Sequence, residues 1–265
     1  MPAATRTAIP ILLLISAAAL AAEKPARPEA EATAALAPCT QTYNGYSRRI
    51  EFSGYTWAVK DHGNQKAGPG PNFFSASTNN VWVDNSGRLH MKITKAKGKW
   101  FAAEVISLCS FGYGTYRFYL DSEADALDPN VVLGLFTWSD DPTDNHRELD
   151  IEFARWADPN NLNAQYVVQP YDVGGHTFRF WQPAAWAQST HEFLWTAGSA
   201  EFESRTGHTT PEQGGVIASY DFHDGIPSAG NENARINLWL FRGRGPTDRE
   251  PVEAIINRFE FEPAP

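Results

Sequence analysis

Three acidic residues alternate with three large apolar residues in the segment 147–153, which reads Arg-Glu-Leu-Asp-Ile-Glu-Phe. Successive side chains of a β-strand point to opposite faces. The acids Glu148, Asp150 and Glu152 therefore share one face, and the apolar side chains between them point into a core. Like charges at three successive positions of one face repel one another and destabilise the strand. The row favours a catalytic function, with chance occurrence and cation binding as the alternatives.

Cleavage of a glycosidic bond is the chemistry that uses such a row. A retaining glycosidase needs two carboxyl groups about 5 to 5.5 Å apart, one as nucleophile and one as acid/base. The Cα atoms of Glu148 and Glu152 lie about 13 Å apart along a straight strand, so their side chains must lean inward on a curved strand. Asp150 is shorter by one methylene and lies between them. A proton or hydrogen bond shared through Asp150 would give the two glutamates unequal pKa values.

The rest of the chain supplies the strands that position this row. From Tyr43 onward, short β-rich runs alternate with turn signals at intervals of roughly ten residues. One clear hairpin joins 81–84 to 88–94 through Asn85-Ser86-Gly87, and places Leu89, Met91 and Ile93 on one face. Few stretches have a helical period, and no boundary divides the series. We therefore expect an all-β fold, a single sandwich of two antiparallel sheets.

The acidic segment resembles a known motif. Glu148-Leu149-Asp150-Ile151-Glu152 is similar to the E-[IL]-D-[IVF]-E signature of family-16 glycoside hydrolases, which include lichenases, laminarinases, agarases, carrageenases and xyloglucan transglycosylases. Further segments resemble that family in the expected order, over roughly Ile50 to Glu262: Gly112–Tyr116, Leu135–Trp138, Thr190–Trp195 with Glu201-Phe202, and Ile236–Trp239. The resemblance implies a β-jelly-roll with a concave substrate cleft and retaining chemistry.

The resemblance also implies roles for individual residues. Glu148 takes the position of the nucleophile, Glu152 that of the acid/base, and Asp150 that of the assisting acid. Substrate contacts are expected from five positions: Asn237, Trp239, Glu104 and Gln165 by the resemblance, and Trp138 by strand parity.

Three departures put mixed-linkage glucan specificity in doubt. Many lichenases have Trp where this chain has His146, which either binds substrate or caps the loop. The arginine expected after the cleft glutamate is absent, and Ile106 takes its register. The segment Ala154-Arg155-Trp156 is not a lichenase ending, although Trp156 lies on the acidic face and is a further candidate for substrate contact.

The first forty residues differ in composition from the rest of the chain. Residues 1–21, with an apolar run from Ile9 to Ala19 and an Ala-Leu-Ala site, are typical of a signal peptide, which predicts a secreted or periplasmic protein. Residues 22–40 are rich in Ala, Glu and Pro and predict a flexible linker ahead of a domain at 41–265. In an exported chain Cys39 and Cys109 are expected to form a disulfide, with two free buried thiols as the alternative.

The net charge of −9 argues against nucleic acid as a partner, and no segment predicts a membrane span or polybasic anchor. A neutral polysaccharide fits this charge. We expect a monomeric endo-acting glycosidase on a β-linked polysaccharide, most simply a β-glucan, without a cofactor or catalytic metal. The alternatives are a glycan-binding module without activity, a transglycosylase, and a calcium-binding sandwich that uses the acidic row.

Overall fold

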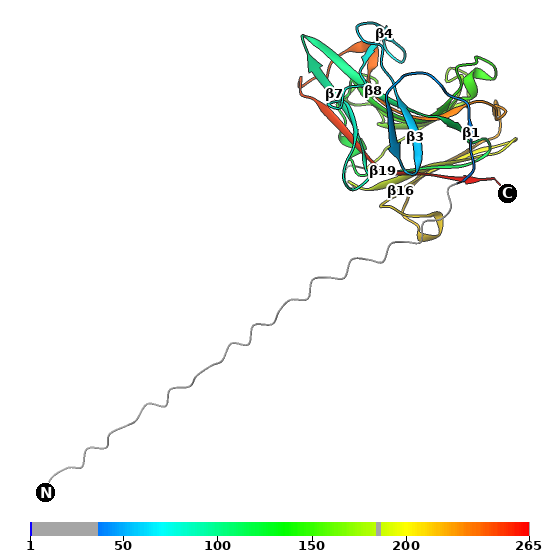
Figure 1. Ribbon diagram of the computed structural model, residues 1–265. Coiled ribbons are helices and arrows are strands. Elements are labelled where there is room, and N and C mark those ends of the chain that lie inside the picture. The colour runs from blue at the N-terminus through cyan, green and yellow to red at the C-terminus, as the bar shows by residue number, and fades with distance from the viewer. Residues whose placement is uncertain (2–36, 184–186, 265) are drawn as a thin grey trace. The chain divides into compact units, whose positions relative to one another are not determined.

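The strands of the chain form two facing antiparallel sheets, as predicted (Figure 1). The computed structural model describes Met1 and residues 37–183 and 187–264. The predicted signal peptide (apart from Met1) and most of the predicted linker lie outside these residues. No helix within the described ranges is long and apolar enough to cross a membrane.

The first sheet carries the acidic row and is called here the cleft sheet. Its strands pair in the order β14-β13-β12-β11-β18-β8-β3-β2, all antiparallel. Their bounds are Thr177–Phe180 (β14), Ala164–Val168 (β13), Leu149–Ala154 (β12), Val131–Trp138 (β11), Asn233–Leu240 (β18), Lys99–Ser107 (β8), Tyr55–Val59 (β3) and Arg49–Phe52 (β2).

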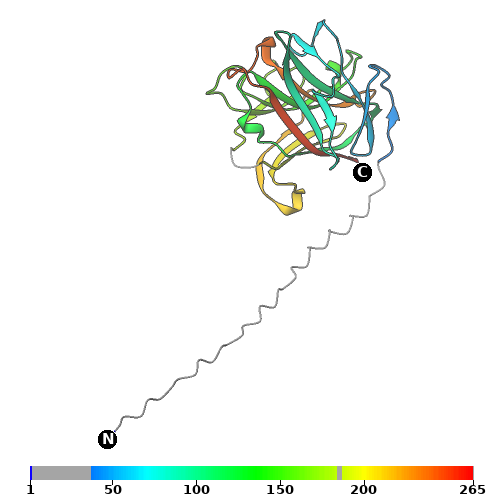
Figure 2. The same ribbon diagram turned by 60° about the vertical axis from the view of Figure 1, so that its left-hand side comes forward.

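The second sheet covers the apolar face of the first. Its order is β17-β16-β15-β10-β19-β7-β6. The bounds are Val216–Phe222 (β17), Ala200–Thr206 (β16), Ser189–Trp195 (β15), Gly114–Leu120 (β10), Val252–Pro263 (β19), Leu89–Ala96 (β7) and Val81–Val83 (β6). The hairpin of β7 with β8 passes from one sheet to the other (Figure 2).

Short elements complete the architecture. Strand β1 (Thr40–Gln41) pairs with β9 (Cys109–Ser110), and β4 (Lys66–Ala67) pairs with β5 (Asn72–Phe74), which also runs parallel to β8. Four single-turn 3-10 helices lie in the described loops: Ala124–Ala126, Asn145–Arg147, Pro211–Gln213 and Phe241–Gly243.

The core lies between the two sheets and follows the period of two read from the sequence. Leu149, Ile151 and Phe153 are fully buried on one face of β12, as are Leu89 and Met91 on β7. Each such side chain contributes about 1.5–3 kcal/mol by leaving water. The predicted hairpin forms at 81–83 and 89–96, where the side chain of Asp84 accepts hydrogen bonds from the backbone N–H of Ser86 and Arg88. Burial of this face therefore turns the opposite face of β12 toward the cleft.

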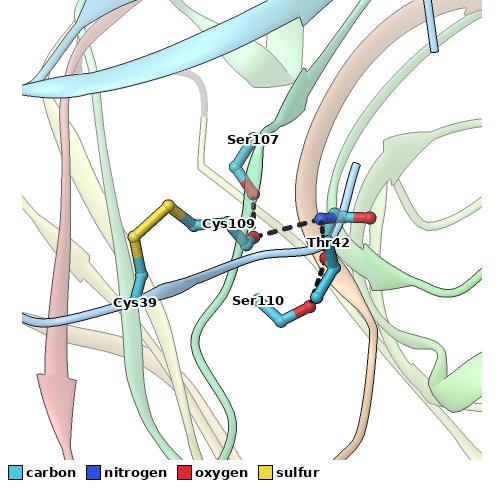
Figure 3. The surroundings of a disulfide bond; sticks show 6 residues. Cys39, Thr42, Ser107, Cys109 and Ser110 are labelled. Carbon is cyan, nitrogen blue, oxygen red and sulfur yellow. Dashed lines mark hydrogen bonds between the residues drawn. A yellow bond between two sulfur atoms is a disulfide. The ribbon is translucent and has the colours of Figure 1, made fainter. Parts of the chain in front are cut away.

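The predicted disulfide is present and joins Cys39 to Cys109, with 5.4 Å between the Cα atoms (Figure 3). It links the residue that precedes β1 to the first residue of β9, at the end of the short β1–β9 pair. The alternative of two free thiols is therefore wrong.

Candidate active site

The three acids lie at the start of β12 and along the strand. Asp150 and Glu152 are on the face opposite Leu149 and Ile151, and Glu148 immediately precedes the strand in an extended conformation (φ −95°, ψ 122°). All three line one cleft of about 440 Å³. The predicted common face is therefore confirmed.

A left-handed turn delivers the chain to Glu148. The four residues Asp144, Asn145, His146 and Arg147 have φ values of 51°, 51°, 62° and 54°. Such values cost a non-glycine residue roughly 1–2 kcal/mol each. Hydrogen bonds hold the turn: Ser139 N donates to the carbonyl of His146 (2.6 Å), and Thr137 Oγ1 donates to the carbonyl of Arg147 (2.8 Å). The backbone ahead of Glu148 is thus fixed against β11.

The strand register brings the predicted polar positions into one row across the sheet. Glu152 lies opposite Gln165 on β13 and opposite Gly134 on β11, Gly134 lies opposite Asn237 on β18, and Asn237 lies opposite Glu104 on β8. Gly134 must be small here, because a Cβ atom would lie 2.5 Å from Asn237 Oδ1. That oxygen is buried and has no hydrogen-bond partner among the described residues.

Glu104 is buried and paired with two cations. Lys60 Nζ lies 2.7 Å from its Oε2, and a guanidinium nitrogen of Arg235 lies 3.6 Å from its Oε1. Arg235 is the register partner of Ile106, so an arginine from the neighbouring strand stands beside the position where the sequence lacks one. Neither Lys60 nor Arg235 was predicted, because only the pairing of β8 with β3 and with β18 reveals their places.

Two tryptophans line the cleft, Trp138 from β11 and Trp239 from β18, both on the same side of β12. Trp239 is mostly buried, and its ring lies 6.2 Å from that of Trp156. Trp138 stacks on His146 with 3.9 Å between ring centroids and 10° between planes. Trp138 lines the cleft, whereas His146 does not. Sugar rings present apolar C–H faces that suit such flat surfaces.

The other predicted contacts lie just behind this lining. Trp156 Nε1 donates to Gln165 Oε1 (3.3 Å), and Gln165 Nε2 donates to Glu152 Oε2 (2.7 Å). His146 Nδ1 lies 2.8 Å from the carbonyl oxygen of Ser139, which agrees with the loop-capping interpretation. None of Gln165, Trp156 and His146 is among the residues that line the cleft, but each lies beside one that does: Glu152, Trp239 and Trp138 respectively.

Sequence reasoning also missed residues from the N-terminal segment. Tyr43 and Tyr46 line the cleft although they precede β2, and His62 joins them from the loop after β3. Tyr46 Oη and His62 Nε2 form a hydrogen bond of 2.7 Å. Their spacing in the sequence carries no motif, and only the fold brings them to the site.

Burial governs the protonation of the acidic row. Desolvation, followed by the charge of Glu152, raises the pKa of Glu148 to about 8, and a hydrogen bond with Asp150 lowers it. Desolvation, followed by the charge of Asp150, raises the pKa of Glu152 to about 8. Burial and the charge of Glu148 raise the pKa of Asp150 well above its usual range. Because each carboxylate raises the pKa of its neighbour, the three acids do not all ionise at neutral pH.

A hydrogen bond couples the protonation of Glu148 to that of Asp150. A hydrogen bond between Glu148 and Asp150 lowers the pKa of Glu148 and raises that of Asp150, which is the pattern of a protonated aspartic acid donating to a glutamate. Arg235 also lowers the pKa of Glu148. The directions of these shifts favour a protonated Asp150 that donates to Glu148.

In the described part of the chain, no group of three or more His, Cys, Asp or Glu side chains is placed to hold a metal ion. The acidic row itself is spread along the strand and does not converge on one point that a cation would occupy.

The fold, a β-jelly-roll with a concave sheet, is similar to the fold of solved β-glucanases and related glycoside hydrolases. A Bacillus licheniformis β-glucanase is similar with a TM-score of 0.60 at 22% identity, over 84% of this chain and 100% of that one. A β-1,3-1,4-glucanase (lichenase) from a mouse hindgut metagenome is similar with a TM-score of 0.57 at 19% identity, over 78% and 93% of the chains.

A third similar structure has a different description. The Mycobacterium tuberculosis protein described as an immunostimulatory antigen and pseudo β-1,3-glucanase has a TM-score of 0.58 at 17% identity, over 84% of this chain and 100% of that one. No protein-family model matches the chain, and no curated protein sequence matches it. At these identities the likeness establishes the fold, which agrees with the sequence resemblance to family 16.

Proposed function

We propose that this protein is a secreted retaining glycosidase of the family-16 type that hydrolyses a β-linked polysaccharide. The observation that carries the proposal is the acidic row Glu148, Asp150 and Glu152 on the floor of a cleft flanked by Trp138 and Trp239. The predicted leader and the disulfide support secretion, because disulfides persist in oxidising compartments.

In the first step the Glu148 carboxylate attacks the anomeric carbon. The glycosidic C–O bond breaks as the Glu152 carboxylic acid gives its proton to the leaving oxygen, and a covalent glycosyl ester forms on Glu148. The raised pKa of Glu152 supports this role, because an acid that stays protonated near neutral pH can donate. Gln165 holds the Glu152 carboxyl in place through its 2.7 Å hydrogen bond.

In the second step the roles of Glu152 reverse. Its carboxylate takes a proton from a water molecule, the water oxygen attacks the anomeric carbon, and the Glu148 carboxylate leaves with the configuration retained. Asp150 is held by Gln169, whose Nε2 donates to its Oδ2 (3.0 Å), and its proton stabilises the charge that returns to Glu148. Asp150 thereby acts as the assisting acid.

The charges around the cleft favour a neutral sugar. Its two lining cations are already neutralised: Lys60 by Glu104, and Arg235 by Asp140 (2.9 Å) and Glu104. A sulfated or uronic polymer would meet the acidic row without a free cation among the lining residues. A β-glucan is therefore the substrate class that we propose.

The test is a panel of neutral and anionic polysaccharides with measurement of new reducing ends, run on the wild type and on Glu148→Gln and Glu152→Gln. Each variant should lose activity by several orders of magnitude, and product from the wild type should carry the substrate's anomeric configuration by NMR. Binding of glucan without new reducing ends would instead identify a glycan-binding module. Transfer to an added acceptor sugar in preference to water would identify a transglycosylase.

A further inference from the structure

The concave face of the cleft sheet is covered at its β3 end. The segment Cys39–Ser47, called here the arm, crosses this end before β2 begins. Tyr43 of the arm packs on Ala58 of β3 and Ile106 of β8, with Tyr46 against the same cluster. The surface of β3 that would continue the cleft floor is thus occupied by the protein itself.

Several bonds hold the arm in this place. The disulfide fixes Cys39 to Cys109, and Thr42 Oγ1 lies 2.7 Å from Ser110 Oγ (Figure 3). The Asn233 amide of β18 donates to Thr42 Oγ1 and to the carbonyl of Cys109, each at 3.1 Å. The Arg235 guanidinium lies over the Tyr43 ring at 5.6 Å. The arm is therefore fixed in position beside the cleft.

The loop that follows β3 and contains β4 covers the same end of the cleft sheet. Lys60 Nζ donates to the carbonyl of Gly68 (2.8 Å), and Asn72 Nδ2 donates to that of Pro69 (2.9 Å), which draws the loop with β4 onto the cleft. Tyr46 and His62 connect the two segments through their hydrogen bond, with 5.6 Å between ring centroids. In Figure 1 the blue arm arches from β1 past β3, and the cyan loop carries β4.

We propose that the arm and the β4 loop form an end wall, in which Tyr46 and His62 set the length of the product. This inference rests on the proposed glycosidase function. From β12 to β8 there are three strand spacings, about 14 Å, which is room for roughly two or three sugar rings. A chain end fits on this side, whereas an internal stretch of polymer does not. The wall thus favours release of short products from a chain end, in contrast to the endo mode expected from the resemblance.

The experiment measures product length and viscosity together on a soluble glucan that the wild type hydrolyses. The wild type should release oligosaccharides of one or two short lengths, with little loss of viscosity per reducing end formed. In Tyr46→Ala combined with His62→Ala, mean product length should rise about twofold, because the two side chains that join the arm to the β4 loop and close this end of the cleft are removed. Viscosity should then fall earlier in the reaction.

A second variant and a control separate this effect from misfolding. Cys39→Ser combined with Cys109→Ser frees the arm without touching the cleft lining, and should lengthen the products in the same direction. Tyr220→Ala removes a ring of similar size from β17 of the other sheet, and should leave the product profile unchanged. Circular dichroism and melting temperature establish that each variant is folded.

The two proposals fail in different ways. A wild type that hydrolyses glucan but gives a broad product ladder, or wall variants with the wild-type ladder, would overturn the end wall and leave the glycosidase standing. A folded wild type that forms no reducing ends from any polysaccharide would overturn both.

Discussion

Replacing Glu152 with glutamine should make the protein more stable and inactive. The glutamine keeps the size of the side chain and an oxygen that accepts from Gln165, but it removes the ionisable group. In the folded protein burial raises the pKa of Glu152 from 4.5 to about 8, whereas in the unfolded chain the pKa stays near 4.5. The folded state therefore holds a proton that the unfolded state releases.

The pH dependence follows from this difference. Below pH 4.5 both states are protonated and the group contributes no penalty. Between pH 4.5 and 8 the unfolded state is ionised and favoured by up to 1.36 kcal/mol for each pH unit, so stability falls as pH rises; above pH 8 the penalty is constant. A raised pKa from 4.5 to about 8 corresponds to at most about 5 kcal/mol for an isolated group. Because Asp150 and Glu148 share the charge, we expect about 2 kcal/mol at pH 8.

Urea unfolding of the wild type and of Glu152→Gln at pH 4, 6 and 8 measures this free energy directly. The two proteins should coincide at pH 4, and the variant should exceed the wild type increasingly toward pH 8, with a gain in melting temperature of about 4–8 °C. A matched control is Glu201→Gln, an exposed residue on β16. A variant less stable than the wild type at pH 8, or a gain independent of pH, would refute the reasoning.

Three further outcomes are expected. The alkaline limb of kcat/KM should lie near pH 8, where Glu152 loses its proton. The hydrogen bond from Gln165 lowers the pKa of Glu152, so its removal in Gln165→Ala should raise that pKa and move the limb to higher pH. A pH–rate profile that does not move would contradict this. Trp138→Ala should raise KM at least tenfold by removing a stacking surface, whereas His146→Phe, which keeps a ring on Trp138, should change KM by less than about threefold; equal effects would contradict the stacking argument. Reduction of Cys39–Cys109 should lower the free energy of unfolding by about 4 kcal/mol, a value of the chain-entropy model for a loop of 70 residues, as measured by urea titration with and without reductant; unchanged stability would show that the arm is held without the disulfide.

The sequence was sufficient for the fold class and for the acidic row. Alternation of apolar and polar residues fixes which face of a strand is buried, so Leu149 and Ile151 determine the side on which Asp150 and Glu152 emerge. The same local signal predicted the hairpin of β6 and β7. The ordered set of resembling segments then predicted the sheet that places Asn237 and Glu104 in one row with Glu152.

The surroundings of that row could not be predicted in the same way. Arg235 reaches Glu104 across a strand pair, and its use depends on a register that joins residues more than a hundred positions apart. Tyr46 and His62 come to the cleft through a disulfide and a loop, which follow no period. The sequence places His146 two residues before Glu148, but only the left-handed turn shows why its ring stacks on Trp138 and lies outside the lining.

Two destabilising features, a left-handed backbone and a buried acid, lie on adjacent residues just before β12. Four successive left-handed residues, at roughly 1–2 kcal/mol each, precede a buried acid whose ionised form is disfavoured by its neighbours. Neither feature stabilises the sandwich: a glycine in the turn would relieve part of the strain, and a leucine in place of Glu148 would remove the buried acid. The fully buried side chains Leu149, Ile151 and Phe153 offset these costs from the opposite face of the same strand. Backbone strain and buried acids thus occur together at one end of β12, beside aromatic rings. Functional sites commonly combine such unfavourable features, whereas a sheet with a purely structural role gains nothing from them.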